Sequence, residues 1–496
     1  MNKPVSNPAS KTVRKISYIA TSATFLLTAL LAPQAAFGSA FAINELGVRA
    51  QGMGGAFTSI ADDGSALFYN PAGIAFQKGF HMEMDTLAVV GLFRFFPSDP
   101  PPGTTVPANG YSGSVKPHFI PVANAYLTKE LSKKFTFGFG VMVPFGLAAN
   151  FTNFNDGDPA NTKFPGRFDG TRARLESYWF QPTIAYRLTE NSAIAIGPAL
   201  VHTHLFYEQS ILNPLDDGKT FGQEVAGVLF PGQNPVEAAN SIARLLPEGR
   251  FRLAGVGNAL GIAGGYIYKN PKTKTNFGVM YRSSVNNHLA GIASFAFTST
   301  GSIASFLPNA APIPSLFPTQ AATGRLTTPA TYQVGVSTSA FHNMLMAFDV
   351  EVQDFDRFAS LPINFTQTSG TATPAERRIV FDFRNSYILH AGVEKKIKEG
   401  MTARMGYVFD HSPVPDKSTG PLFPDNTRNS FTIGASKMHG TTEFSMFYQA
   451  MFFLDRNTNV LANKDEFTNG LYSNFAHLLG LSMRMNLSGG KSSGKK

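Results

Sequence analysis

Short segments in which apolar side chains alternate with small or polar ones recur through most of this chain. At residues 135–143, for example, odd-numbered positions carry Phe or Val and even-numbered positions carry Thr, Gly or Met. Similar alternation occurs at residues 277–282, 332–337 and 479–487. Because side chains point alternately to the two faces of a strand, this pattern predicts half-buried β-strands. It fits both a soluble sandwich, whose apolar face meets another sheet, and a membrane barrel, whose apolar face meets lipid.

The connections between these segments alternate between short and long, and this favours a barrel. Short turns rich in polar residues are predicted at 128–134, 189–192, 269–274, 339–343, 395–400 and 437–441. Long segments rich in Pro, Gly, Asn and Asp lie between them, at 97–115, 148–174, 208–252, 286–326, 359–383, 411–428 and 455–471. Short turns at one rim and long loops at the other are typical of bacterial outer-membrane barrels. Seven long and six short connections predict an all-β, antiparallel transmembrane barrel of 14 strands, an even number as such barrels require.

The composition argues against helical membrane spans and against a nucleic-acid partner. Hydrophobic residues make up 43% of the 496 residues, yet beyond the N-terminal leader no run approaches the ~20 apolar residues of a spanning helix. Of the net charge of +9, seven charges lie in the leader and the C-terminal tail, which leaves about +2 for the rest. The absence of cysteine excludes disulfides, thiolate metal sites and cysteine nucleophiles.

The first 40 residues have the organisation of a secretory signal peptide. A basic region at 3–15 precedes an apolar stretch at 16–31 and a small-residue region at 35–40. We therefore expect cleavage between Ala36 and Ala40 and export to the outer membrane of a Gram-negative cell. A membrane anchor is the alternative, but Ser and Thr residues interrupt an apolar stretch that is already short for a span.

Residues 61–73 differ from the strands that follow, because they are rich in small side chains and end at an Asn-Pro pair. Proline disfavours helical geometry in the residue before it, and Asp62 and Asp63 are residue types that cap helices. We therefore predict a short helix followed by a fixed turn at Asn70, Pro71 and Ala72.

The domain boundaries follow from these segments. Residues 41–79 are predicted to form a hatch that plugs the lumen, residues 80–487 the barrel, and residues 488–496 a basic disordered tail.

Two long connections carry apolar side chains. Residues 236–246 place Val, Ala, Ile and Leu at helical spacing, and the 286–326 connection includes Phe295 and Phe297. These side chains either line a docking groove for an apolar solute or pack on each other as a cap, and the sequence leaves both possibilities open.

No catalytic, metal or cofactor site is predicted. His202 and His204 share one face of a strand, but no third metal ligand accompanies them. The glycines at 255–261 lack the spacing and the βαβ context of a dinucleotide loop, and no Gly-x-Ser-x-Gly motif is present. An outer-membrane lipase and a structural or adhesive barrel are the alternatives from other functional classes.

The segments around the predicted hatch resemble the mature start of the FadL outer-membrane transporters. The carrying motifs are Ser-Ala-Phe-Ala-Ile-Asn-Glu at 39–45, Ala-Asp-Asp at 61–63 and Asn-Pro-Ala-Gly at 70–73. Further matches follow in order at 144–147, 181–186, 278–283, 329–330, 406–407, 410, 412–415, 422–425 and 428. This resemblance implies passive uptake of long-chain fatty acids, or of aromatic hydrocarbons such as toluene, through a 14-stranded barrel closed by a hatch. We expect a monomer in contact with outer-membrane lipid and lipopolysaccharide.

The resemblance also implies a route for the ligand: a groove among the external loops, a deeper pocket touched by the mature N-terminus, and lateral exit at a kink in the third strand. That strand, predicted at 135–147, contains Gly138, Gly140 and Pro144, residue types that weaken a strand ladder. Alternatively, the glycines make room for the hatch and Pro144 marks the external end of the strand. The candidate ligand contacts are Phe41, Ile43, Phe145, Leu147, Phe295 and Phe297, with Arg282 and Arg404 as candidate partners of a carboxylate.

Overall fold

The computed structural model describes most of the chain between Ala40 and Ser488. The described residues are 40–97, 113–115, 120–152, 165–211, 232, 249–297, 313–341, 343–369, 371, 373–420, 423–458 and 468–488. The signal peptide predicted at 1–40 lies outside them except for Ala40, as do the helix predicted at 236–246 and the tail beyond Ser488.

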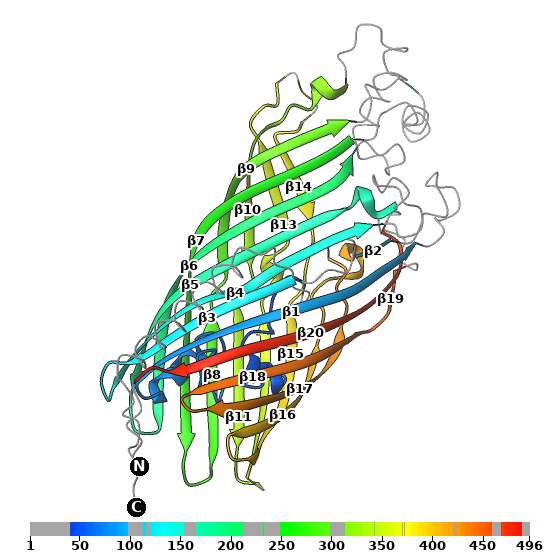
Figure 1. The fold of residues 1–496 in the computed structure, drawn as a ribbon. Coiled ribbons are helices and arrows are strands. Elements are labelled where there is room, and N and C mark those ends of the chain that lie inside the picture. Colours follow the sequence, from blue (N-terminus) through cyan, green and yellow to red (C-terminus); the bar gives the residue numbers. More distant parts are fainter. Residues whose placement is uncertain are drawn as a thin grey trace, which may run out of the picture.

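Within these ranges, the chain forms one sheet of 20 antiparallel strands that closes into a barrel (Figure 1). The strands are β1 (Phe80–Pro97), β2 (Gly113–Val115), β3 (Ile120–Glu130), β4 (Phe135–Thr152), β5 (Arg172–Arg187), β6 (Ser192–Ile211), β7 (Gly249–Asn270), β8 (Thr275–Arg282), β9 (Val285–Phe297), β10 (Gln320–Thr328), β11 (Thr331–Thr338), β12 (Met344–Gln353), β13 (Ser360–Phe365), β14 (Glu376–Val380), β15 (Ser386–Lys398), β16 (Met401–Asp410), β17 (Arg428–His439), β18 (Thr442–Phe453), β19 (Arg456–Asn457) and β20 (Gly470–Asn486).

Several of these strands are successive parts of one crossing of the wall. β8 and β9 both pair with β7, for example, and β18 and β19 both pair with β20. Counted by crossings, the described strands form a 14-stranded barrel, as predicted. Pairing of β1 with β20, from His81↔Asn486 to Pro97↔Gly470, closes the sheet and leaves no free edge between the first and last strands.

One rim carries the six short turns that the sequence predicts, and two of them depend on glycine. The turns lie between β3 and β4, β5 and β6, β7 and β8, β11 and β12, β15 and β16, and β17 and β18. Gly400 and Gly440 have φ angles of 70° and 62°, a left-handed conformation that glycine adopts without steric cost.

Some connections predicted as long loops contain strands. β9 extends to Phe297 and β10 begins at Gln320, so Phe295 and Phe297 lie on a strand and not in a loop. β13 and β14 occupy part of the predicted 359–383 connection, and β4 continues beyond Leu147 to Thr152. The prediction was wrong at these points because the large apolar side chains of the continuations do not alternate strictly and have Ala, Gly and Asn between them, although the strands remain paired with their neighbours.

The outer surface of the wall carries many exposed large apolar side chains. Leu260 is 78% exposed, and Phe277, Val334, Met405 and Ile433 are also exposed. Contiguous apolar surface of this kind is unfavourable in water and matches the lipid-facing band of an outer-membrane barrel.

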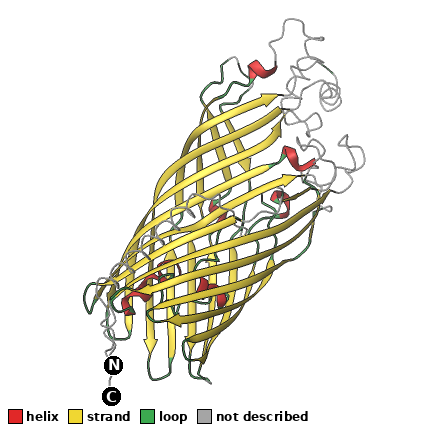
Figure 2. Cartoon of the chain, in the orientation of Figure 1, coloured by secondary structure: helices red, strands yellow, loops and turns green. Residues whose placement is uncertain are grey.

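Residues 40–79 fold inside the barrel and form α2 (Val48–Gly52), α3 (Ala66–Tyr69) and η1 (Pro71–Phe76). Figure 2 shows these short helices surrounded by strands. Other short helices are η2 (Pro165–Phe168), η4 (Ile313–Leu316), η5 (Phe355–Arg357) and η6 (Asp416–Ser418). Among the described residues, none of the helices has the length and apolar character needed to cross a membrane.

The hatch backbone packs directly on the barrel wall where the wall residue is glycine. A Cβ atom at Gly406 would lie 2.2 Å from the backbone nitrogen of Gly54, and one at Gly392 would lie 2.1 Å from the carbonyl oxygen of Met53. Any side chain at these two positions would displace the hatch backbone. The hatch and the barrel wall therefore pack together in one core.

We predict that the purified protein shows different mobilities on an SDS gel before and after boiling. Each crossing is hydrogen-bonded to both neighbours over most of its length, so the closed sheet has no edge at which detergent can begin to separate strands. Identical mobilities in both samples, together with solubility in plain buffer, would contradict a membrane barrel.

Candidate functional site

The third crossing of the wall, β4, loses its regular pairing with both neighbouring strands near Pro144. β4 pairs with β3 only up to Ala125↔Val141, and pairing resumes with β2 at Val115↔Phe151. No ladder pair among the described residues joins β4 to these neighbours in between. On its other side, the register with β5 shifts between Met142 and Phe145, a bulge that contains Pro144. Because proline has no N–H and bulges bend strands, the residue types account for the local break.

The first residues of the hatch form a short strand-like contact at this interruption. Ala42 forms an antiparallel bridge with Phe145. The Ile43 N–H donates to the Pro144 carbonyl at 2.8 Å, and the Gly146 N–H donates to the Phe41 carbonyl at 2.8 Å. Residues 41–43 therefore satisfy backbone groups that the neighbouring strand does not reach, and each such group left buried and unpaired would cost roughly 1–3 kcal/mol.

The two glycines of β4 lie below the interruption, in the regular part of the ladder. Gly138 pairs with Thr128 and Gly140 with Tyr126. A Cβ atom at Gly138 would lie 2.7 Å from Leu67 Cδ2 and 2.8 Å from Ile74 Cδ1, both side chains of the hatch. The structure thus associates the glycines with room for the hatch and associates Pro144, which lies in mid-strand and not at the external end, with the break.

Aromatic side chains surround Phe41 next to the interruption. The Phe41 ring is fully buried, with centroid distances of 4.8 Å to Phe358, 5.4 Å to Phe355 and 6.0 Å to Phe145. These rings come from the hatch, from β4 and from the connection between β12 and β13. Tertiary structure alone assembles this cluster, because its members are far apart in the sequence.

An apolar cavity of about 40 Å³ adjoins this cluster. Its lining includes Phe41, Leu147, Leu175, Leu205 and Leu361. This space accommodates only one or a few water molecules, so an extended alkyl chain enters only if side chains such as Phe41 move.

The predicted apolar contacts divide into two groups. Phe41, Ile43, Phe145 and Leu147 gather at the interruption. The other two, Phe295 and Phe297, pack against Phe317 at 5.5 Å and 5.4 Å, at the external end of β9. Phe295 also lies 5.2 Å from Phe251 of β7, so this second group packs among aromatic rings at the rim.

The two predicted carboxylate partners both hold the hatch. The Arg282 guanidinium donates to the Phe68 carbonyl at 2.6 Å and lies 4.1 Å from the centre of the Phe68 ring. Arg404 donates to Glu394 at 2.7 Å, and Glu394 in turn accepts from Arg49 of the hatch at 2.8 Å. Alternation located these arginines on the polar side of their strands, but it could not show that the Phe68 carbonyl of the hatch binds Arg282 and that Glu394 of the wall binds Arg404.

Arg49, which the sequence analysis missed, links the hatch to the wall through carboxylates on both bodies. Its guanidinium binds both oxygens of Glu394, at 2.8 Å and 3.0 Å, and also pairs with Asp62. Burial alone would lower the pKa of Arg49, but the carboxylates of Asp62 and Glu394 raise it well above the usual arginine value. Asp62 is thus an ion-pair partner and not a helix cap, whereas Asp63 accepts from the Ser65 N–H just before α3, at 2.9 Å.

The predicted turn at Asn70, Pro71 and Ala72 is buried and contacts the wall. The Asn70 side-chain amide donates to the Thr58 carbonyl at 2.8 Å and to the Tyr266 carbonyl of β7 at 3.0 Å. Its oxygen accepts from the Ala72 N–H at 3.2 Å, which caps η1, and Pro71 occupies the first turn of that helix. Asn70 therefore ties together two parts of the hatch and the barrel.

Glu45 is a buried hatch carboxyl close to the N-terminal contact. Burial raises the pKa of Glu45 to about 7, although the Arg428 guanidinium opposes this shift. The backbone N–H of Asn44 donates to the Glu45 carboxyl at 3.1 Å. The protonation state of this group therefore changes close to neutral pH.

His202 and His204 form a hydrogen-bonded pair with 2.7 Å between their Nε2 atoms, and His202 Nδ1 lies 2.7 Å from Asn258 Oδ1. Within the described ranges, no group of three or more His, Asp or Glu side chains is arranged to hold a metal ion.

Comparisons with known proteins agree on one family. Residues 29–485 match the family described as "Outer membrane protein transport protein (OMPP1/FadL/TodX)". The chain is 25% identical over 452 residues to the long-chain fatty acid transport protein of Escherichia coli K12, which covers 84% of this chain and 92% of that protein. It is 24% identical over 426 residues to the 47 kDa outer membrane protein of Pasteurella multocida, which covers 83% of this chain and 87% of that protein.

Solved structures share the fold. A Pseudomonas aeruginosa FadL homologue superposes with a TM-score of 0.72 at 19% identity, covering 90% of this chain and 99% of that chain. The P. putida toluene transporter TodX superposes with a TM-score of 0.63 at 16% identity, covering 89% of this chain and 98% of that chain.

We predict that Asn70→Ala loosens the hatch while the barrel stays folded. The change leaves buried backbone groups without partners, at roughly 1–3 kcal/mol for each group. Ion leak through single channels in planar bilayers should rise, and heat-modifiable mobility should be retained. Asn286→Ala, an exposed position that bonds Thr327 on the wall, is the matched control and should leave the leak unchanged. Equal leak in both variants and the unmodified protein would limit Asn70 to a role in folding.

We also predict that the hatch is held less firmly as pH rises from 5 to 8. The docked pKa of Glu45 near 7, against a usual value of 4.5, favours the protonated carboxyl in the docked state. This pKa difference stabilises the docked hatch by roughly 3 kcal/mol. The stabilisation is complete below the usual pKa of 4.5 and is lost as the pH rises through the docked pKa of about 7. Ion leak should therefore increase with pH, and Glu45→Gln should flatten the response. A response that is unchanged in Glu45→Gln would assign the effect to another group.

Proposed function

This chain belongs to the OMPP1/FadL/TodX family of outer membrane transport proteins, and we propose that it takes up long-chain fatty acids by passive diffusion. Its wall is an outer-membrane barrel, and the family transports hydrophobic compounds. The choice of fatty acids is supported by the curated relatives described as long-chain fatty acid transport proteins, which align with 84% of this chain. Aromatic hydrocarbons of the toluene kind are the second candidate, which the shared fold with toluene transporters supports.

The observation that carries the proposal is the interrupted ladder of β4, occupied by residues 41–43. We infer that a ligand enters from the external loops, displaces Phe41 from the aromatic cluster and leaves sideways between β4 and its neighbour. Unpaired backbone facing lipid is costly, so such a break persists only where other protein groups cover it. Here the cover is residues 41–43 of the chain itself, and the proposal is that this segment moves.

The apolar lining supplies the binding energy in this proposal. Each buried CH₂ group contributes ~0.8 kcal/mol, so a long tail offsets the cost of moving the Phe41 ring out of its aromatic cluster. The steps are binding and diffusion down a gradient, and no catalytic role is assigned to any residue. An esterase assay on the purified protein tests the lipase alternative, and extraction of copurifying lipid tests the structural or adhesive alternative.

We predict that a cross-link between residues 42 and 145 abolishes uptake. Ala42→Cys with Phe145→Cys joins two residues of one antiparallel bridge, the geometry in which a disulfide forms readily, and the natural chain has no cysteine to interfere. Uptake of labelled oleate and of toluene should fall to background in the oxidised variant and return on reduction. The reduced double variant serves as its own control for the loss of the Phe145 ring.

A second cross-link separates lateral exit from release of the whole hatch. Gly52→Cys with Gly434→Cys joins α2 to β17, where Cβ atoms would lie 3.3 Å and 2.9 Å from the opposite Cα atoms, so the hatch backbone shifts slightly to admit the bridge. The reduced variant, measured for uptake and heat-modifiable mobility, is the control for this shift. Uptake should persist in this variant, because the ligand leaves beside β4 while the hatch body stays in place. Uptake that survives the 42–145 cross-link but not the 52–434 cross-link would overturn the lateral route.

A further inference from the structure

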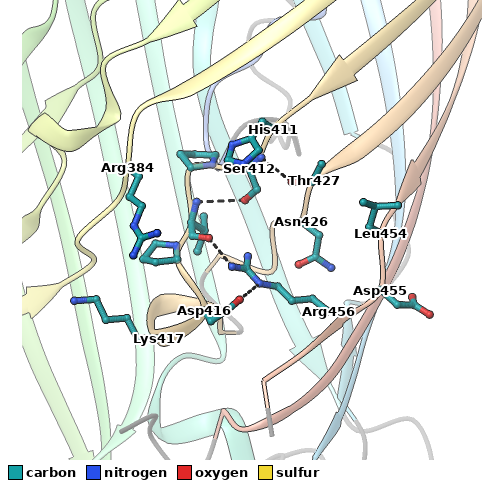
Figure 3. A pocket seen from close by; sticks show the side chains of 13 residues that line it. Arg384, His411, Ser412, Asp416, Lys417, Asn426, Thr427, Leu454, Asp455 and Arg456 are labelled. Carbon is teal, nitrogen blue, oxygen red and sulfur yellow. Dashed lines mark hydrogen bonds and ion pairs between the residues drawn. The ribbon is translucent and has the colours of Figure 1, made fainter. Parts of the chain in front are cut away.

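A polar recess of about 520 Å³ lies at the external rim, among the connections at the ends of β15, β16, β17 and β18 (Figure 3). Arg384 reaches it from the connection before β15, Lys417 from the connection between β16 and β17, and Arg456 from β19. His411, Asn426 and Leu454 also line it. None of these residues contributes to the hatch, to the cluster around Phe41 or to the break in β4.

The recess adjoins exposed side chains at the external ends of β15 and β18. The His411 ring stacks on Tyr387 with a centroid distance of 5.1 Å and an interplanar angle of 12°. Tyr387, Phe452 and Leu454 are 43%, 48% and 53% exposed. Exposed aromatic side chains at the rim of an outer-membrane barrel mark the membrane interface. The recess therefore lies at the height of the headgroups of the outer leaflet.

The three cationic side chains of the recess differ in the ion pairs and hydrogen bonds that they already form. Arg456 is fixed, because it donates to Asp416 at 2.6 Å and to the Val414 carbonyl at 2.8 Å. Lys417 pairs with Asp382 at the exposed surface. The guanidinium of Arg384 has no ion pair with any described residue. In Figure 3, Arg384 and Lys417 lie on one side of the recess and Asp455 lies on the other.

A buried polar atom in the lining lacks a partner. Asn426 is 2% exposed, and its Oδ1 atom has no hydrogen bond to any described residue. Such an atom is unfavourable unless a bound molecule or water satisfies it. The recess thus combines cations on one side with a side-chain acceptor that a hydroxyl donor would satisfy.

We propose that this recess binds the phosphate of a phosphorylated glycolipid of the outer leaflet. The phosphate lies against Arg384 and Lys417, with charge-assisted hydrogen bonds from both. A sugar hydroxyl donates to Asn426 or Asp455 on the opposite side, and the acyl chains follow the outer wall beside Leu454 and Phe452. The same cations would also accept free phosphate, so the two sources of the phosphate group have to be distinguished by experiment.

The test measures binding to the full-length protein in nanodiscs with three probes: bis-phosphorylated lipid A, the same lipid without phosphate, and inorganic phosphate. Arg384→Gln combined with Lys417→Gln should weaken binding of the phosphorylated lipid about tenfold, because the phosphate then has no charge-assisted hydrogen bond from either side chain. Arg378→Gln is the matched control, since it removes another exposed external arginine that does not line the recess, and it should bind like the unmodified protein. Arg384→Gln alone should give an intermediate loss.

The three probes also identify the source of the phosphate. Binding of phosphorylated lipid, with weak binding of the dephosphorylated lipid, supports the glycolipid. Binding of inorganic phosphate without any preference for the phosphorylated lipid supports a phosphate site for small solutes and overturns the glycolipid. Equal affinity of the double variant, the Arg378 variant and the unmodified protein for every probe overturns the site. Heat-modifiable mobility checks that each variant is folded.

Discussion

Backbone hydrogen bonding in a wall that faces lipid is the constraint on which the rest of this structure depends. A closed antiparallel barrel satisfies it by pairing every crossing on both sides, and pairing of β1 with β20 removes the last edge. The ladder of β4 breaks around Pro144, and the first residues of the hatch supply the missing partners there. The wall therefore needs the N-terminal residues of the hatch at this position, because they pair with backbone groups of β4 that no neighbouring strand reaches.

Different interactions hold the two ends of the hatch. The body is joined to the wall by buried charge pairs centred on Arg49 and Glu394 and by the amide of Asn70. The N-terminal residues are held by two backbone hydrogen bonds to β4, by the Ala40 N–H that donates to the Asp425 carboxylate, by the Gln353 amide that donates to Asn44, and by aromatic packing around Phe41. The charge of Glu45 lies close to these contacts. An apolar ligand competes directly with ring packing, whereas it offers nothing in exchange for a buried ion pair. This contrast explains why we assign movement to the N-terminus and not to the body.

Sequence reasoning succeeded where a feature depends on local periodicity and failed where it depends on which surfaces meet. Alternation predicted the strands and the six short turns, but it missed the continuations of β9 and β4 because their large apolar side chains do not alternate strictly with polar ones. The residue types at Arg282 and Arg404 suited a carboxylate ligand, but the Phe68 carbonyl of the hatch occupies Arg282, and Glu394 of the wall occupies Arg404. Asp62 suited a helix cap, but Arg49 lies beside it. In each case the competing partner comes from another segment of the chain, which the tertiary fold brings beside the residue.

The sequence by itself determined an antiparallel barrel with 14 crossings, short turns at one rim and a distinct segment that precedes the strands, because side-chain alternation and turn chemistry act over a few residues. Only the tertiary structure decided that Gly138 makes room for Leu67, that residues 41–43 complete the ladder at Pro144, and that rings from distant segments surround Phe41. These contacts depend on how the hatch is seated within the closed barrel, and no local pattern encodes that placement.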